Sequence, residues 1–491
     1  MNRNDALRQM AAGLPEDIAR LKAAGYYQEA IGQIDALLAE NWQQTQRGGS
    51  RAGGPVNPMP AAPDALRASL EAQREILQRL PAEYPYDLPA ALARVQAHIP
   101  DFTMEELQAL LRENRIDWRF VEGQKHCAAR FYETLVYTDA AFAARAGTPS
   151  DGSSLRYRRE CAAAMRSRGG LAARIQIRAG VKASEAAFAR AMAAARADGR
   201  SAVRARVWLP LPAACPSQSE VELLGFSAQP TAIAPDHAPQ RTAFWETELT
   251  ENTAFTAEYR YVNTAPWHDP MAPAVPADTA ADAAFLDPAA CLGEELPHIS
   301  FTPYLRALVA QLTADAATPA EKASRIYDYI TLNVKYRFMP AYFVLDSIAD
   351  NCARSRRGDC GVQALTFITM CRIAGIPAAW QSGLMAAPDD VGSHDWALFW
   401  LDGQGWLYAD CSFGGGAAGA GDEALRRHYF GNLDPGRMVA NRAFQAPLTP
   451  AKQSWRADPY DNQTGEIELE GVGLSFDERD GEAVMVKYET L

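Results

Sequence analysis

A cysteine, a histidine and an aspartate follow one another in this sequence in an order that suits acyl-transfer chemistry: Cys360, His394 and Asp410. A thiolate attacks carbonyl carbon, a histidine accepts the thiol proton, and a carboxylate fixes the orientation and tautomer of the imidazole. Each residue alone would more often be structural, as a buried small cysteine, a surface histidine or a carboxylate at a strand end. The combination predicts a Cys-His-Asp site for nucleophilic catalysis.

The segment that begins at Cys360 predicts the element that positions the thiol. Nearly every position after it is apolar or small, until Gly375 and Pro377 close the segment as a C-terminal cap. A helix that is apolar all round is a buried helix. In its first turn, after Gly358 and Asp359, the free N–H groups and the helix dipole favour a thiolate and can stabilise an oxyanion. We therefore expect Cys360 to be an activated thiolate.

The segments HDWALFWLD and WLYAD predict a β-hairpin that carries the other two residues. His394 and Asp410 can meet only if they share a face, so the length of the connecting loop decides. A two-residue loop places them on opposite faces. A three-residue loop over 402–404 pairs Leu401 with Gly405 and sets Asp410 diagonal to His394. We predict the three-residue loop, or a bulge with the same effect.

The motifs around these residues resemble those of the transglutaminase-like superfamily. GDCGVQALTFITMCRIAGIPA resembles its nucleophile motif, and HDWALFWLDGQGWLYADCSFG resembles its histidine strand, aromatic turn and aspartate strand. The resemblance covers about 300–447, with spacings similar to those of compact bacterial members. It implies a papain-like core in which Cys360 attacks an amide or ester carbonyl, His394 transfers the proton and Asp410 holds His394. The backbone N–H of Cys360 would be one oxyanion donor.

The same resemblance implies further residues around the site. A second oxyanion donor is usually a side chain upstream of the nucleophile, and the candidates are Tyr336, Tyr342 and Asn351. Trp380 and Gln381, which follow the helix, are candidates to line the acyl groove. Aromatic core packing suits Trp380 and the two tyrosines equally well. The segment over 430–444 is expected to be a loop that walls the cleft or packs between domains.

The rest of the chain predicts further domains of an α+β protein around this core. Residues 1–150 are expected to be mostly helical, with a linker rich in Gly and Pro near 47–63. Short segments with period-2 alternation predict a β-sandwich domain over 171–265. The catalytic core is expected at 295–447, and a C-terminal extension with short strands at 448–491.

Composition limits the classes of function. A formal net charge of −12 gives a nucleic-acid role no electrostatic support. The chain has neither a secretory leader nor a run approaching about 18 apolar residues, so we expect a cytoplasmic protein without a membrane partner. The eight cysteines are scattered, and no cysteine or histidine cluster has zinc-ligand spacing. We therefore expect no disulfide framework, no metal and no cofactor.

These observations predict a cysteine-dependent acyl-transfer enzyme that hydrolyses an amide or peptide bond in a protein, peptide or other amide substrate. Water is the simpler acceptor, because transamidation needs an exposed channel for an amine. The alternative from another class is a catalytically silent binding or scaffold protein with the same fold. A third hypothesis, metal-assisted hydrolysis, would use Cys352, Cys360, Cys411 and His394.

Overall fold

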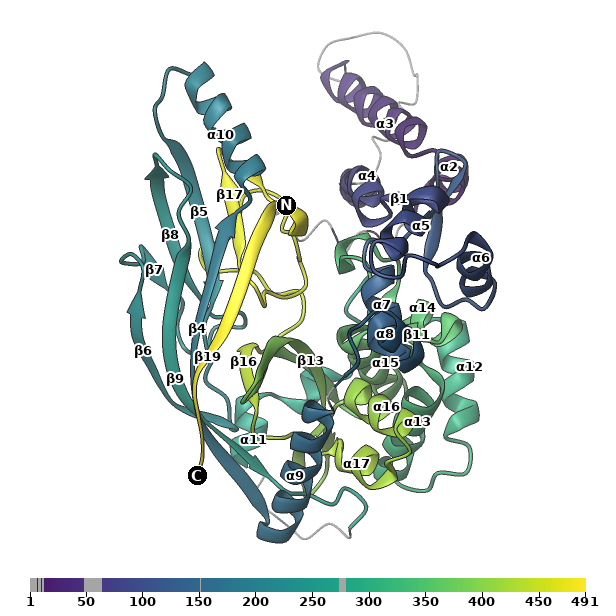
Figure 1. Cartoon of the computed structure of the whole chain (residues 1–491), viewed down its shortest axis with the longest axis vertical. Helices are drawn as coiled ribbons and strands as arrows, with labels where there is room; N and C mark the ends of the chain where they lie inside the picture. The colour runs from purple at the N-terminus through teal and green to yellow at the C-terminus, as the bar shows by residue number, and fades with distance from the viewer. Residues whose placement is uncertain (1–6, 8–9, 11–12, 48–63, 151, 273–279) are drawn as a thin grey trace. The chain divides into compact units, whose positions relative to one another are not determined.

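The computed structural model describes residues 7, 10, 13–47, 64–150, 152–272 and 280–491. The chain divides into two units (Figure 1). Unit 1 is Met1–Asp151 together with Glu295–Pro297 and Arg337–Asp346, and unit 2 is the remainder. The predicted linker at 47–63 lies outside the described residues, except for Arg47, the last residue of a helix.

Unit 1 is mostly helical in its described part. Gly25 separates the first two helices in the left-handed region, with φ +84°, where a Cβ would meet the carbonyl of Phe120. Buried apolar side chains such as Leu107 and Phe131 form its core. The elements are α2 (Glu16–Ala24), α3 (Tyr27–Arg47), α4 (Asp64–Glu83), β1 (Tyr86–Asp87), α5 (Leu88–Gln96), α6 (Met104–Arg112), β2 (Trp118–Val121), β3 (Gln124–Cys127), α7 (Phe131–Thr138), α8 (Ala140–Arg145) and η3 (Tyr342–Val344).

Unit 2 contains two antiparallel sheets with the strand orders β18-β17-β5-β8-β7 and β19-β4-β9-β6. Alternate residues of both sheets, including Ile175 of β4, Val207 of β5 and Tyr259 of β9, are buried in one shared core. The strands are β4 (Gly170–Ala183), β5 (Val203–Pro210), β6 (Gln218–Phe226), β7 (Ala232–Ile233), β8 (Thr242–Leu249), β9 (Phe255–Pro266), β17 (Glu466–Leu469), β18 (Val472–Gly473) and β19 (Arg479–Thr490).

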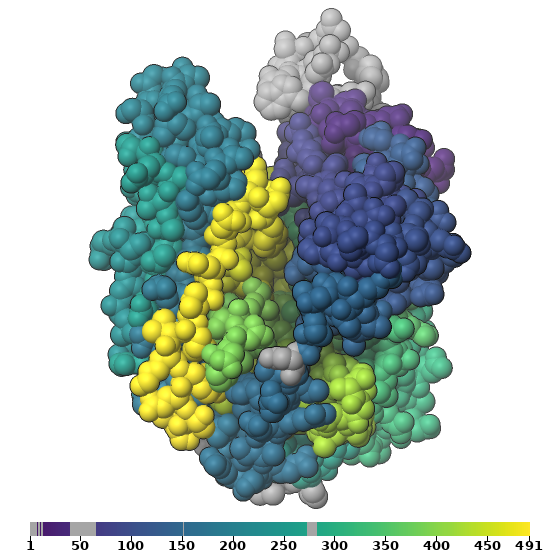
Figure 2. Space-filling view, in the orientation of Figure 1, coloured from purple at the N-terminus to yellow at the C-terminus, as the bar shows by residue number. Residues whose placement is uncertain are grey.

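The C-terminal segment supplies strands to both of these sheets. β17 pairs with β5, and β19 pairs with β4 along nearly its whole length. The end of the chain, yellow in Figure 2, lies at the surface as an edge strand, where Val484 and Val486 are exposed. A helix that sequence analysis did not predict, α10 (Glu185–Ala197), connects β4 to β5 and packs Phe188 and Met192 on the shared core.

A third sheet, with the order β15-β14-β13-β12-β16, carries the candidate site. Helix α15 packs against it, and Phe367 of α15 contacts Phe399 of β13 with ring centroids 5.7 Å apart. The strands are β12 (Ala378–Ala387), β13 (Asp390–Leu401), β14 (Gly405–Ala409), β15 (Phe430–Gly431) and β16 (Arg437–Asn441). The expectation that 430–444 is a loop is therefore wrong in part, because it contains β15 and β16.

Helices pack against this third sheet, and α16 (Cys411–Gly419) and α17 (Glu423–His428) connect β14 to β15. Helix α13 (Pro319–Asn333) begins with a capping box formed by Thr318 and Glu321. The remaining elements of unit 2 are α9 (Ser153–Arg168), α11 (Ala280–Phe285), η2 (Pro288–Cys291), α12 (Pro303–Leu312), α13 (Pro319–Asn333), β10 (Lys335–Tyr336), α14 (Ile348–Ser355), β11 (Arg357–Gly358), α15 (Cys360–Ile373), α16 (Cys411–Gly419), α17 (Glu423–His428) and η4 (Phe476–Glu478). Across the ranges that the structure describes, no helix has the length and apolar character needed to cross a membrane.

Candidate active site

The hairpin of β13 and β14 has the register that the parity argument requires. Leu401 pairs with Gly405 across a three-residue loop, so the predicted odd-length loop is confirmed. The register places His394 and Asp410 on the same face, just beyond the last ladder pair. The imidazole Nε2 lies 2.7 Å from Oδ2 of Asp410, and both side chains are buried. The structure thus brings these two predicted site residues together.

The carboxylate of Asp410 is fixed through both oxygens. Asp410 is the N-cap of α16, and its Oδ1 accepts hydrogen bonds from the backbone N–H of Phe413 at 2.9 Å and the hydroxyl of Ser412 at 3.0 Å. The Phe413 ring also packs against the imidazole, with centroids 4.5 Å apart. These contacts hold His394 in one orientation, with Nδ1 as the ring nitrogen that remains for proton transfer.

A buried arginine at the start of β16 provides the positive charge beside this pair. Nη2 of Arg437 lies 3.0 Å from Oδ2 of Asp410 and 2.9 Å from Oδ2 of Asp434. Burial alone would raise the pKa of Asp410, but His394 and Arg437 outweigh it and hold that pKa well below its usual range. Sequence analysis missed Arg437, and the available signal was an arginine leading the otherwise apolar strand RMVAN.

His394 is held neutral in this environment. Burial lowers the pKa of the imidazole, and the neighbouring carboxylate of Asp410 raises it only in part, so the pKa stays below its usual value. A neutral imidazole with one nitrogen bonded to a carboxylate has the state that a general base needs. The Asp410 pair therefore supplies orientation without leaving His394 protonated at neutral pH.

Cys360 is the first residue of α15, as the sequence predicts. Asp359 is the N-cap and accepts a hydrogen bond from the backbone N–H of Val362 at 3.2 Å. The residue as a whole is partly exposed, while its Sγ points inward and donates to Oδ2 of the buried Asp395 at 3.2 Å. Burial, followed by the carboxylates of Asp395 and Asp359, raises the pKa of Cys360 well above its usual value. The expectation of a thiolate is wrong for this arrangement, because these effects outweigh the helix dipole.

The structure does not join the thiol to the predicted base. Among the hydrogen bonds between described residues, Cys360 contacts Asp395, and His394 contacts Asp410, but no bond links Cys360 to His394. Asp395 directly follows His394 on β13, so their side chains point to opposite faces of the strand. Sequence analysis placed the histidine and passed over its neighbour, which is the residue that meets the sulfur.

Asp395 has an environment rich in carboxylates. Its Oδ1 accepts a hydrogen bond from the side-chain amide of Gln463. Burial raises the pKa of Asp395 well above its usual range, and the carboxyl groups of Asp461 and Asp359 raise it further. Within the described chain, no lysine or arginine forms an ion pair with Asp395. The group that holds the thiol therefore lies among other carboxyl groups.

The other predicted residues lie in varied places. Trp380 is buried in β12 and packs against Phe444, with ring centroids 5.4 Å apart. Gln381 is also buried, and its Oε1 accepts a hydrogen bond from Trp396 Nε1 at 3.0 Å, on the His394 face of the sheet. Tyr342 belongs to unit 1, so its role at the site stays a prediction. The two other upstream candidates are Tyr336 in β10 and Asn351, exposed on α14.

The structure does not assemble the metal-ligand set of the third hypothesis. Cys352 and Cys411 are buried, and burial raises the pKa of both thiols. In the part of the chain that the structure describes, no group of three or more His, Cys, Asp or Glu is arranged to hold a metal ion.

Comparisons with known proteins support the sequence resemblance. Residues 306–411 match the model of the transglutaminase-like superfamily core. No curated protein matches the chain. Among solved structures, a candidate cysteine protease from Cytophaga hutchinsonii is 16% identical over 65% of this chain and 91% of its own, with a TM-score of 0.38.

A second solved structure is the periplasmic domain of TgpA from Pseudomonas aeruginosa, which is 15% identical over 50% of this chain and 98% of its own, with a TM-score of 0.26. Similarity at these scores carries no information on activity. The family model covers the nucleophile helix and both strands of the hairpin, and its last matched residue is Cys411. Residues 306–411 of this chain are therefore a core of the transglutaminase-like superfamily.

Proposed function

We propose that this chain is a cysteine-dependent acyl-transfer enzyme that hydrolyses an amide or peptide bond through a thioester. The observation that carries the proposal is the buried pair of His394 and Asp410, 2.7 Å apart, in a core whose nucleophile helix begins at Cys360. A neutral imidazole oriented by an ionised carboxylate is the base that a thiol nucleophile requires. The match to the transglutaminase-like core supports the same assignment.

In the proposed acylation step, Nδ1 of His394 accepts the proton of the Cys360 thiol while the sulfur attacks the carbonyl carbon of the substrate. The C–S bond forms as the carbonyl π electrons move to oxygen. Backbone N–H groups at the start of α15 stabilise that oxyanion. The tetrahedral intermediate then collapses, the C–N bond breaks, and His394 gives its proton to the leaving amine. Asp410 stays ionised throughout and steadies the imidazolium.

Water completes the proposed reaction. His394, again neutral, accepts a proton from water as the water oxygen attacks the thioester carbonyl. The C–S bond breaks, the carboxylic acid leaves, and the proton returns from the imidazolium to the Cys360 sulfur. Trp380 and Gln381 stay candidates to line the acyl groove, and Tyr342 stays a candidate for the second oxyanion donor. The substrate class proposed is a protein, peptide or other amide, with no metal or cofactor.

One observation favours the alternative of a catalytically silent binding protein. The Cys360 thiol is bonded to Asp395 and has a raised pKa, so the described arrangement holds an unactivated nucleophile. A silent protein could keep this arrangement permanently, whereas an enzyme must leave it during turnover. The two functions therefore differ in whether Cys360 ever forms a covalent adduct with an acyl donor.

Activity-based profiling with amide and peptide electrophiles tests the proposal. We expect wild-type protein to be labelled at Cys360 and Cys360→Ala to be unlabelled, with His394→Ala reduced by at least about a hundredfold, as for loss of a general base. Cys215→Ala is the matched control, because Cys215 is the other thiol that is not fully buried. Labelling that persists in Cys360→Ala, or an absence of labelling across a broad panel, would favour the silent protein.

A further inference from the structure

The Cys360 thiol forms its hydrogen bond with one of two consecutive residues of β13. Sγ of Cys360 donates to Asp395 rather than bonding to His394, which precedes it on β13. The two side chains lie on opposite faces of the strand, and the Asp395 face is the one against which α15 packs. Asp395 is thus within reach of the proposed nucleophile, and on the side from which the nucleophile helix approaches.

Asp395 is itself held by residues from the C-terminal part of the chain. The side-chain amide of Gln463 donates to its Oδ1, and also to the backbone carbonyl of His394 at 3.3 Å. Ser382, which pairs with Asp395 across the strands, donates its hydroxyl to Oδ2 of Asp461 at 2.6 Å. Asp461 is buried beside Asp395, and the two carboxyl groups interact.

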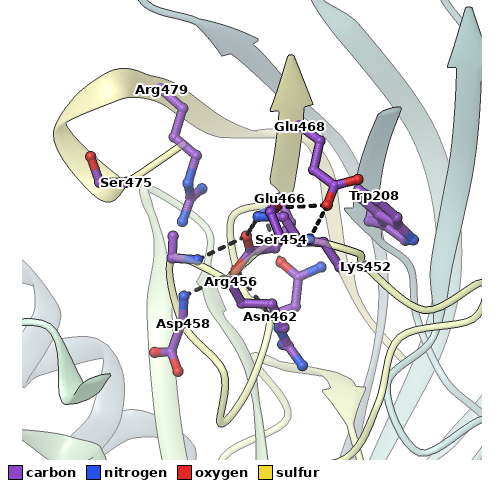
Figure 3. Close-up of polar contacts among 12 residues, drawn as sticks. Trp208, Lys452, Ser454, Arg456, Asp458, Asn462, Glu466, Glu468, Ser475 and Arg479 are labelled. Atoms are coloured by element: carbon purple, nitrogen blue, oxygen red, sulfur yellow. Dashed lines mark hydrogen bonds and ion pairs between the residues drawn. The ribbon is translucent and has the colours of Figure 1, made fainter. Parts of the chain in front are cut away.

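These C-terminal residues are anchored by buried charges. We call residues 452–466 the clamp. Its ends are joined by the ion pair of Lys452 and Glu466 (Figure 3). Lys452 Nζ lies 2.7 Å from Glu466 Oε2, and both side chains are buried. Between them, the backbone N–H groups of Ala457 and Asp458 both donate to Glu466 at 3.0 Å. Burial raises the pKa of Glu466, but Lys452 and two arginines outweigh it and lower that pKa to about 2.

Glu466 also begins β17, which pairs with β5, so the clamp is continuous with the shared core of the two large sheets. Arg456, fully buried, adds hydrogen bonds to the carbonyls of Ala446 and Asp461 and to the side chain of Gln240. These buried ion pairs and hydrogen bonds fix the position of the clamp. Asp461 and Gln463 are therefore presented to Asp395 at set positions.

We propose that Asp395 is a positioning residue that holds Cys360 as a protonated thiol in the resting protein, and that the clamp holds Asp395 in place. The proposal rests on the proposed function, because the residue held is its nucleophile. The thiol must then exchange its hydrogen bond to Asp395 for one to His394 before attack. No covalent bond changes in this step, and the proton stays on sulfur until the imidazole accepts it.

The charged and titratable groups around this contact fit the role. Asp359 is the N-cap of α15, and Asp458 and Asp461 come from the clamp, where Arg456 partly offsets the burial that raises the pKa of Asp461. Asp395 accepts the hydrogen bond from Sγ, and a carboxylate at this position disfavours a thiolate beside it. The contact orders the thiol without activating it.

Alkylation of Cys360 by iodoacetamide, located by mass spectrometry and followed from about pH 5 to about pH 9, tests the proposal. We expect Asp395→Asn to accelerate alkylation at neutral pH by about tenfold or more, because each unit of pKa changes the thiolate fraction tenfold. The pH profile should also move to lower pH, which a merely structural role would not produce. A rate and profile within about twofold of wild type would overturn the proposal.

The clamp provides a second variant in case Asp395→Asn does not fold. Gln463→Leu removes the amide that holds Asp395 and should also accelerate alkylation of Cys360, by less than Asp395→Asn; a rate unchanged from wild type would contradict the role of the clamp. Asp390→Asn, an exposed carboxylate on the same strand, is the matched control and should leave the rate unchanged. Because alkylation needs no turnover, its outcome stands apart from the profiling of Cys360→Ala that tests the proposed function.

Discussion

Two buried aspartates lie on either side of the same strand, and their pKa values are shifted in opposite directions. Asp410 is 1% exposed and Asp395 is 5% exposed, so burial disfavours the carboxylate in both. Yet the pKa of Asp410 is lowered while that of Asp395 is raised. The difference comes from the partners: Asp410 meets Arg437 and His394, whereas Asp395 meets other carboxyl groups.

The site therefore has two sides. On the side of Asp410, the charged side, neighbouring groups favour an ionised carboxylate; on the side of Asp395, the uncharged side, burial and other carboxyl groups disfavour one. The charged side orients the base and is ready for proton transfer. The uncharged side receives the nucleophile and leaves it protonated. Because Cys360 contacts Asp395, the reactivity of the thiol depends on whether it faces Asp395 or His394.

The largest expected effect comes from removing the cation of the charged side. Arg437→Met leaves Asp410 and Asp434 buried without their shared counter-ion, which should lower the free energy of unfolding by about 3–5 kcal/mol. Chemical unfolding at neutral pH measures it. Arg260→Met, which breaks only the exposed pair with Glu222, is the control and should cost less than about 1 kcal/mol. Similar losses for the two variants would show that the buried cation is not needed.

A second change makes the charged side neutral instead. Asp410→Asn loses the ion pair with Arg437 and weakens the α16 cap, and we expect a loss of about 2–3 kcal/mol at neutral pH. In the wild type, the folded pKa of Asp410 is depressed, so its contribution is present above the unfolded pKa of about 3.9 and disappears as pH falls below it.

Unfolding measured from about pH 7 down to about pH 3 checks this linkage. The gap between wild type and Asp410→Asn should narrow steadily as the pH falls below about 4, because Asp410 of the unfolded wild type then takes up a proton while Asp410 of the folded protein stays ionised. A gap that stays constant with pH would mean that Asp410 is not charged in the folded protein.

Asp395, on the uncharged side, should make stability depend on pH in the opposite direction. The folded pKa of Asp395 is raised, so its stabilising contribution is present below about pH 4 and is lost as pH rises toward the folded pKa. Asp395→Asn cannot ionise, and we expect it to become more stable than the wild type by about 1 kcal/mol as the pH is raised to about 8. The free energies of unfolding of the two proteins at about pH 5 and about pH 8 measure this trend. If Asp395→Asn became less stable relative to wild type at the higher pH, the expectation would be wrong.

A similarly modest effect is expected at the Ser382 hydroxyl, which lies beside the carboxyl pair of Asp395 and Asp461. Ser382→Ala removes the donor to Asp461 and the acceptor for Nδ2 of Asn441, both within 3.0 Å. We expect a loss of about 1–2 kcal/mol, as for a buried hydrogen bond left unmade. Ser393→Ala, at an exposed position of β13, is the control and should be neutral within about 0.5 kcal/mol. Equal effects for the two would argue that Ser382 does not hold the carboxyl group.

Local patterns in the sequence were enough to predict much of this site. The apolar run after Cys360 predicts α15, and the alternation around the hairpin predicts β13 and β14 with their loop length. Parity then brings His394 to Asp410, because strand residues alternate faces. The sequence predicts such a contact well when its two residues are close in the chain and only two registers are possible.

Contacts made across long stretches of chain were not predictable in this way. Nothing local in RMVAN says that Arg437 reaches Asp410, and nothing in the segment after 448 says that Gln463 reaches Asp395. The thiolate expectation was wrong for the same reason, since the helix dipole is a local effect and the two carboxylates beside the thiol include one from another element.

The pairing of β19 with β4 has a consequence for how the protein is made. β4 is synthesised early, whereas β17 and β19 follow the catalytic core in the chain. On the ribosome, Cys360, His394 and Asp410 all emerge before the strands that complete both large sheets and before Gln463, so a partly translated chain has its nucleophile without the segment proposed to hold it. Contacts of such long sequence separation also form slowly. A newly made chain would therefore pass through an interval in which its thiol is less sheltered than in the finished protein.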